Sequence, residues 1–238
     1  MQRISRCIIS LMIITCNLSV WAQDSIKVPL NIRAGFDIYG PASYFANRKN
    51  LSLEGFVALE LDSKKSLVLE VGYQNFKYSQ YNYNYLSKGA FILGGIDFNM
   101  IQPFVAGGKY YAGIGLRYGL SIFSSEVPSF KHDNYWGTGT GFIASAVHAA
   151  HFVEITPGIK TEILKNISIG WNIRLRLMVY SGTGKNLKPV SVPGYGNGAK
   201  SFSPGINYYI IFNFPYKSVF MKPEPEKVSE KETESVKR

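Results

Sequence analysis

The stretch Ile167–Val179, ISIGWNIRLRLMV, places a large apolar residue at every second position. Most of the positions between them are polar or small, and two of them are the arginines Arg174 and Arg176. A period of two predicts a β-strand with one apolar face and one polar face. Two arginines on the polar face of so long a strand favour the wet interior of a membrane barrel over the core of a soluble sandwich.

The same alternation recurs along the chain, and together the segments predict eight strands. Their approximate ranges are 28–39, 51–61, 66–77, 88–98, 108–122, 151–164, 167–179 and 204–214. Short turns alternate with long loops, which are expected at about 40–50, 78–87, 123–150 and 180–203. An even strand number and alternating loop lengths are typical of transmembrane barrels. We therefore expect an all-β, closed, antiparallel, up-and-down transmembrane β-barrel of eight strands over residues 23–216.

A soluble sandwich or lipocalin-like barrel is the alternative fold, because alternation alone does not show which face points inward. The predicted strands are longer than the usual five to six residues. Aromatic residues such as Tyr110, Trp171 and Phe214 gather near the strand ends, as interfacial girdles require. Both features favour the membrane barrel.

The N-terminus predicts export. Arg3 and Arg6 precede a mostly apolar stretch, 7–18, and Val20-Trp21-Ala22 supplies the small residues of a cleavage site before Gln23. The stretch is shorter than the roughly 20 residues that a spanning helix needs. We therefore expect a cleaved signal peptide over residues 1–22 and a location in the outer membrane of a Gram-negative bacterium.

The two cysteines of the chain, Cys7 and Cys16, both lie in the predicted signal, so the mature chain would have no disulfide. Cys16 also allows a lipoprotein, with the chain cleaved and lipidated there. The preceding Ile13-Ile14-Thr15 lacks the small residue usually found just before a lipidated cysteine.

The charge pattern predicts the partners. The formal charge of +10 becomes +8 when Arg3 and Arg6 leave with the signal, which favours outer-membrane lipid and anionic lipopolysaccharide. We expect no nucleic-acid partner, because the sequence has no nucleic-acid-binding motif. We also expect the protein to be a monomer. The segment 217–238 is rich in charge and its part after Pro223 has no aromatic residue, so it predicts a disordered periplasmic tail. This tail is a candidate contact to the cell wall or to an envelope protein.

The polar faces of the predicted strands carry charges that nearly cancel. The cations are Arg33, Lys109, Arg117, Lys160, Arg174 and Arg176, and the anions are Asp37, Glu54, Glu60, Glu70, Asp97, Glu154 and Glu162. An eight-stranded barrel is only wide enough for its own side chains, and unpaired charges there would be costly. We therefore expect a paired charge network that plugs the lumen, with a narrow channel for small solutes as the alternative.

The sequence resembles small outer-membrane β-barrel proteins of Bacteroidota, including a family of unknown function. The resemblance lies in Leu69-Glu70-Val71-Gly72-Tyr73 and in residues 111–119, YAGIGLRYG. It continues in Pro157-Gly158-Ile159-Lys160, in Gly170-Trp171-Asn172-Ile173-Arg174 and in Val192-Pro193-Gly194-Tyr195-Gly196. It implies the fold and the location, and it supplies no catalytic residues.

One group of residues is a candidate for catalysis: Ser145, His148, His151 and Glu154, spaced every three residues. If Phe142–Ala150 formed a helix, several of them would share one face. A serine, a base and an orienting acid suit a lipid-modifying enzyme, which is the alternative function. His148 and His151 lack a clear third ligand, so we expect no metal site, and we expect no cofactor.

Four tyrosines, Tyr78, Tyr81, Tyr83 and Tyr85, crowd the second predicted outer loop. They suit an interface belt, sugar stacking or contact with a partner protein. We expect a structural or surface-interaction role, and the sequence names no ligand.

Overall fold

The computed structural model describes residues 26–46, 48–101, 109–182 and 188–221. The predicted signal peptide lies outside these residues, as does the predicted tail from residue 222 onward. Residues Val28–Val219 form one compact unit, which contains the barrel.

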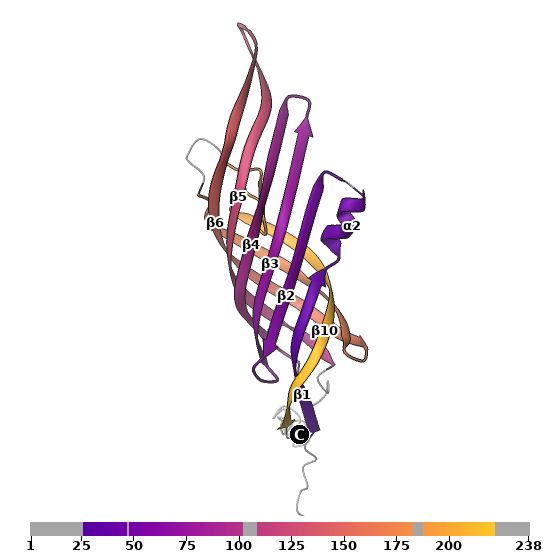
Figure 1. The fold of residues 1–238 in the computed structure, drawn as a ribbon. Helices are drawn as coiled ribbons and strands as arrows, with labels where there is room; N and C mark the ends of the chain where they lie inside the picture. The colour runs from indigo at the N-terminus through magenta and orange to yellow at the C-terminus, as the bar shows by residue number, and fades with distance from the viewer. Residues whose placement is uncertain (1–25, 47, 102–108, 183–187, 222–238) are drawn as a thin grey trace, which may run out of the picture. The chain divides into compact units, whose positions relative to one another are not determined.

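Eight long strands are hydrogen-bonded in a ring (Figure 1). They are β1 (Ile26–Asp37), β2 (Asn50–Glu60), β3 (Lys65–Gln80), β4 (Tyr83–Asn99), β5 (Tyr110–Asn134), β6 (Gly137–Leu164), β7 (Ile167–Tyr180) and β10 (Phe202–Met221). A helix, α2 (Tyr39–Ala46), follows β1, and a small hairpin of β8 (Ser191–Val192) and β9 (Gly196–Asn197) precedes β10. Among the described residues, no helix is long and apolar enough to cross a membrane.

Each long strand pairs with its neighbours in the sequence, and β10 closes the ring against β1. The pairing of β3 with β4 is continuous, from Lys65 opposite Phe98 to Gln80 opposite Tyr83. At the tight turn between β6 and β7, Asn166 adopts a φ of 66°, a left-handed conformation that asparagine tolerates. The predicted all-β barrel of eight antiparallel strands is therefore confirmed.

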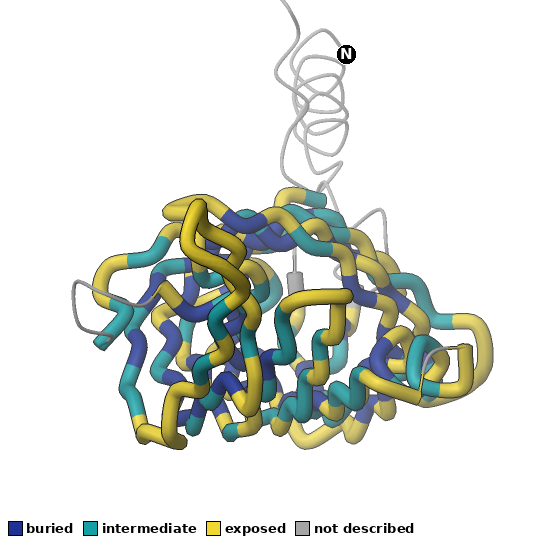
Figure 2. Tube along the Cα trace, turned by 90° about the horizontal axis from the view of Figure 1, so that it is seen from above, coloured by how far each residue is buried: buried dark blue, intermediate teal, exposed yellow. Residues whose placement is uncertain are grey.

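The apolar face of each strand points outward and the polar face points inward. Leu69 and Leu116 are 51% and 53% exposed, whereas their chain neighbours Glu70 and Arg117 are 1% and 4% exposed. Figure 2 shows the same alternation of buried and exposed residues along the strands. A soluble lipocalin-like barrel would show the opposite arrangement, so that alternative is wrong. The barrel therefore has the apolar outer face and the polar interior that are typical of transmembrane β-barrels.

The long loops predicted at about 78–87 and 123–150 are wrong, because both are mostly strand. β3 and β4 meet at a turn at Tyr81 and Asn82, and β5 and β6 meet at Tyr135 and Trp136. Figure 1 shows β5 and β6 rising beyond the other strands. Strand pairing satisfies the backbone hydrogen bonds on its own, so it continues where the side chains no longer alternate clearly. We call this end of the barrel the hairpin end and the opposite end the turn end.

Two further expectations need correction at the strand ends. The predicted loop 40–50 contains α2, whose N-terminal amides are held by the Asp37 carboxylate. β10 continues to Met221, beyond Tyr216, where the barrel was predicted to end. Lys217 and its neighbours therefore belong to a strand and not to the tail.

Candidate functional site in the barrel interior

Arg174, on β7, lies inside the barrel with a fully buried side chain. Its Nη1 donates to both carboxylate oxygens of Glu54 on β2, at 2.6 and 2.7 Å. Its Nε donates to Glu154 on β6 at 2.6 Å, and its Nη2 donates to Glu70 on β3 at 3.1 Å. One guanidinium therefore joins three other strands across the lumen. Since an eight-stranded barrel is only wide enough for its own side chains, this bridge occupies the lumen.

Further ion pairs extend from this bridge. Arg117 on β5 donates to Glu70 at 2.5 Å and to Asp97 on β4 at 3.1 Å. Lys160 donates to Asp97 at 3.2 Å, and Arg176 donates to Glu154 at 2.8 Å. We call this set the interior charge network; its members are Glu54, Glu70, Asp97, Arg117, Glu154, Lys160, Arg174 and Arg176.

The four cations of the network balance its four carboxylates. Buried charges are tolerated when they are paired and hydrogen-bonded, and each carboxylate here accepts from at least one guanidinium or ammonium group. The network is therefore a self-contained polar core, which requires no ion or ligand to neutralise it.

The structure places the other predicted interior charges outside this network. Arg33 and Glu60 form a separate ion pair. Asp37 accepts hydrogen bonds from the backbone of α2 and from the Tyr208 amide. Lys109 is exposed, and Glu162 accepts from the Asn166 amide in the turn between β6 and β7. These last two lie at the turn end, where the barrel interior meets solvent.

A second layer closes the barrel above the network. We call Ser191–Gly198, which contains the β8–β9 hairpin, the inserted segment. Val192 and Tyr195 of this segment are fully buried, and they pack in one cluster with Phe91, Phe123 and Phe152 of the barrel wall. The segment therefore fills the interior at the hairpin end, although the sequence predicted this region as part of an outer loop, 180–203.

Three barrel residues hold the inserted segment through its backbone. Arg176 donates from Nη1 to the Tyr195 carbonyl oxygen at 2.9 Å. Tyr85 and Ser87 both donate their hydroxyl groups to the Ser191 carbonyl oxygen, at 3.3 and 3.2 Å. Arg176 thus connects the inserted segment to the interior charge network.

Sequence reasoning missed the inserted segment, although one signal was present. Phe91, Phe123 and Phe152 lie in register with the polar faces of their strands, which is unusual for a water-facing lumen. Large aromatic residues on an inward face require an apolar partner inside the barrel. The buried ring of Tyr195, between two glycines in the sequence, is that partner.

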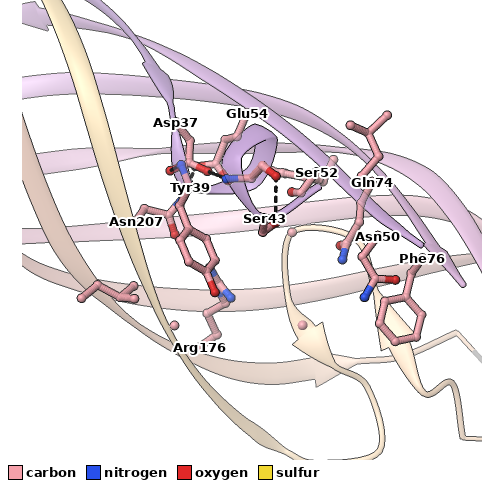
Figure 3. A pocket seen from close by; sticks show the side chains of 17 residues that line it. Asp37, Tyr39, Ser43, Asn50, Ser52, Glu54, Gln74, Phe76, Arg176 and Asn207 are labelled. Carbon is pink, nitrogen blue, oxygen red and sulfur yellow. Dashed lines mark hydrogen bonds between the residues drawn. The ribbon is translucent and has the colours of Figure 1, made fainter. Parts of the chain in front are cut away.

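A cavity of about 400 Å³ lies between α2, the start of β2 and the inserted segment. Figure 3 shows Asn50, Gln74 and Phe76 on one side of it, and Tyr39 and Arg176 on the other. Its acids are already engaged, because Glu54 binds Arg174 and Asp37 binds backbone amides. What the cavity offers to a ligand is therefore its amide, hydroxyl and aromatic groups together with the Arg176 guanidinium.

The four predicted loop tyrosines divide between two places. Tyr78, Tyr83 and Tyr85 lie on the inward face of the β3–β4 hairpin with Phe76, and neighbouring ring centroids are 6.4–6.5 Å apart. Burial raises the pKa of the Tyr83 hydroxyl. Tyr81, at the turn, is 96% exposed. The tyrosines on the inward face do not suit a lipid-interface belt, and they continue the aromatic side of the cavity.

Residues 142–150, which would bring several of the catalytic candidates to one face if they were helical, belong to strand β6. Alternate residues of a strand point to opposite faces, so a three-residue spacing separates the four catalytic candidates. His148 faces inward against Phe123, and Glu154 belongs to the interior charge network. Ser145 is exposed, and His151 bonds the Tyr118 hydroxyl on the outer face. Ser145 and His151 are about 20 Å apart along the strand, so the candidates do not form a triad.

Within the described ranges, no three His, Cys, Asp or Glu residues lie close enough together to hold a metal ion.

The model of one protein family, "Domain of unknown function (DUF6048)", matches residues 2–218. No curated protein matches the chain. Among solved structures, the chain is similar to Acinetobacter baumannii CarO, with 12% identity and a TM-score of 0.38 over 79% of this chain and 98% of that one. It is similar to the N-terminal β-barrel domain of Pseudomonas aeruginosa OprF, with 11% identity and a TM-score of 0.33 over 80% and 100% of the two chains. Neisserial surface protein A has 10% identity and a TM-score of 0.35 over 81% and 96%. The predicted bacterial group, Bacteroidota, stays a prediction.

Proposed function

The chain belongs to the DUF6048 family, and we propose that it is an outer-membrane β-barrel that is closed to solutes and acts at the cell surface. The observation that carries this proposal is the bridge of Arg174 to Glu54, Glu70 and Glu154, which crosses the lumen.

The outer face of the barrel supports the membrane location. Leucine, isoleucine and valine side chains such as Leu69, Val71 and Leu116 are about half exposed around the ring, which in water would favour aggregation. Contact with lipid removes that cost, and the ring has no unpaired strand edge between β1 and β10. The closed ring also supports a monomer.

The predicted location in the outer membrane is tested by fractionation. Protein extracted from the outer-membrane fraction should migrate differently on a gel before and after boiling. A soluble protein without such a shift would contradict the location.

Closure of the lumen is tested by conductance in a planar lipid bilayer. A barrel plugged by the interior charge network and the inserted segment should show no steady openings under mild voltage. Steady openings of the wild-type protein would favour the narrow channel, which was the alternative. Substitution of Arg174 should open a path for ions through the barrel, because the Arg174 guanidinium spans the lumen.

Two features at the hairpin end of the barrel support a role at the cell surface. The cavity beside Tyr39 and Gln74 and the aromatic face of the β3–β4 hairpin stand at the hairpin end. In outer-membrane barrels the longer connections face outside and the short turns face the periplasm. These groups would therefore face the medium and suit contact with a ligand or a partner.

A lipid-modifying enzyme is the remaining alternative, and the lipid-facing pair of Tyr118 and His151 is the feature that keeps it testable. Replacement of His148 and His151 by alanine in the producing cell should leave the mass of lipid A unchanged if the barrel is not an enzyme. A changed mass, with the variant still folded, would support the enzyme.

A further inference from the structure

The outer face of β3 and β4 changes from apolar to cationic towards the hairpin end. Tyr73 and Ala90 are paired, outward-facing and exposed. The next outward positions on these strands are Asn75 and Lys88, and Lys77 follows on β3. Outward residues of one strand are separated by about 7 Å along it, so both lysines lie within about two residue pairs of the apolar belt.

The two lysines flank one hollow. Lys77 is opposite Leu86 and Lys88 is opposite Asn75. The two lysines are therefore diagonal neighbours on adjacent strands, and their Cα atoms are about 7–8 Å apart. A hollow of about 280 Å³ lies between them, and its lining includes Ser124, Ser145 and Glu126. We call this the lysine hollow. Among the residues that the structure describes, no carboxylate pairs with either ammonium group.

The segment before β2 lies beside the hollow. The Lys77 amide donates to the Lys49 carbonyl oxygen at 3.2 Å, which brings the segment before β2 beside β3. Lys77 and Lys88 are both exposed. Glu126 is the one carboxylate among the residues that line the hollow, so Lys77 and Lys88 leave the hollow with a net positive charge.

Another sector of the barrel lacks this arrangement. The corresponding outward positions near the hairpin ends of β7 and β10 are Val179 and Phe202, which are 63% and 46% exposed. The β7–β10 sector therefore has apolar residues at these two positions, whereas the β3–β4 sector has two lysines.

We propose that the lysine hollow binds a phosphate group of an anionic glycolipid in the outer leaflet, the lipid A type. This inference rests on the proposed location in the outer membrane. Two ammonium groups at this spacing can both donate to one phosphate, at the short distances typical of charge-assisted hydrogen bonds. The Ser145 hydroxyl offers one more donor, whereas the Ser124 hydroxyl donates to the Lys88 carbonyl oxygen at 3.4 Å. The acyl chains would then lie along Tyr73 and Ile92 on the apolar face below, which a free phosphate would not use.

The test is a titration of the purified, folded protein in detergent with bisphosphorylated lipid A, followed by native mass spectrometry. Lys77→Ala/Lys88→Ala should weaken binding about 25-fold, since each lysine near an anionic lipid surface contributes about fivefold. The same double substitution should not change the binding of lipid A from which both phosphates have been removed. Lys77→Arg/Lys88→Arg should keep the binding.

Lys64→Ala/Lys65→Ala is the matched control, because it removes two exposed lysines at the turn end. It should bind phosphorylated lipid A like the wild type. The inference is overturned if Lys77→Ala/Lys88→Ala binds as tightly as the wild type while retaining its heat-dependent gel shift. It is also overturned if millimolar inorganic phosphate displaces the lipid, because the site would then take free phosphate. Binding of lipid A is measured on purified protein in detergent, whereas the location is measured by fractionation. The two experiments therefore test the lipid A site and the outer-membrane location separately.

Discussion

Replacement of Arg174 by methionine removes the centre of the interior charge network and should destabilise the barrel by about 4 kcal/mol. The change deletes four charge-assisted hydrogen bonds. Glu154 keeps Arg176 at 2.8 Å, and Glu70 keeps Arg117 at 2.5 Å. Glu54 keeps only neutral donors, the Tyr209 hydroxyl at 2.9 Å and the Asn207 amide at 3.4 Å. A buried charge left without its partner costs about 3–5 kcal/mol, and Glu54 is that charge.

The free energy of unfolding is measured from reversible denaturant titrations in detergent, with tryptophan fluorescence as the signal. Arg174→Met/Glu54→Gln should recover about 2 kcal/mol relative to Arg174→Met, because it removes the unpaired charge. Lys160→Met is the control and should cost about 1 kcal/mol, since Asp97 keeps Arg117 at 3.1 Å. The reasoning is refuted if Arg174→Met costs no more than Lys160→Met, or if the double variant is as unstable as the single one.

Two further predictions concern the layer above the network. Gly194→Ala should cost about 1–3 kcal/mol and expose the inserted segment to protease, because Gly194 has a φ of 74° and its new Cβ would meet the Phe91 ring. Gly94→Ala, which meets nothing within 4 Å, should be neutral, and equal effects of the two variants would argue against the tight packing of this segment. In a chain whose native cysteines are replaced by serine, Ser52→Cys in the cavity should react with a water-soluble maleimide on the folded protein. Ser121→Cys, fully buried in the lumen, should not react, and its rapid labelling would indicate an open lumen.

The sequence by itself determined the class of fold and the unlike faces of each strand. Alternation through Ile167–Val179 requires a strand with unlike faces, and charges such as Arg174 on one face require a polar environment on that side. Because these features are local in the chain, they predict eight strands without knowledge of contacts, and the strand lengths and the aromatic residues near the strand ends favour an apolar outer surface.

Only the tertiary structure decided which residues meet inside the barrel. Arg174 and Glu54 are 120 residues apart, and nothing in the alternation of β2 or β7 selects this pair from the other inward charges. The strand register and the stagger of the closed ring select it. The place of Tyr195 is decided in the same way, because its segment has no strand period and is held by the wall residues that the ring brings around it. Periodicity shows which face a side chain takes, whereas closure of the ring determines its partner.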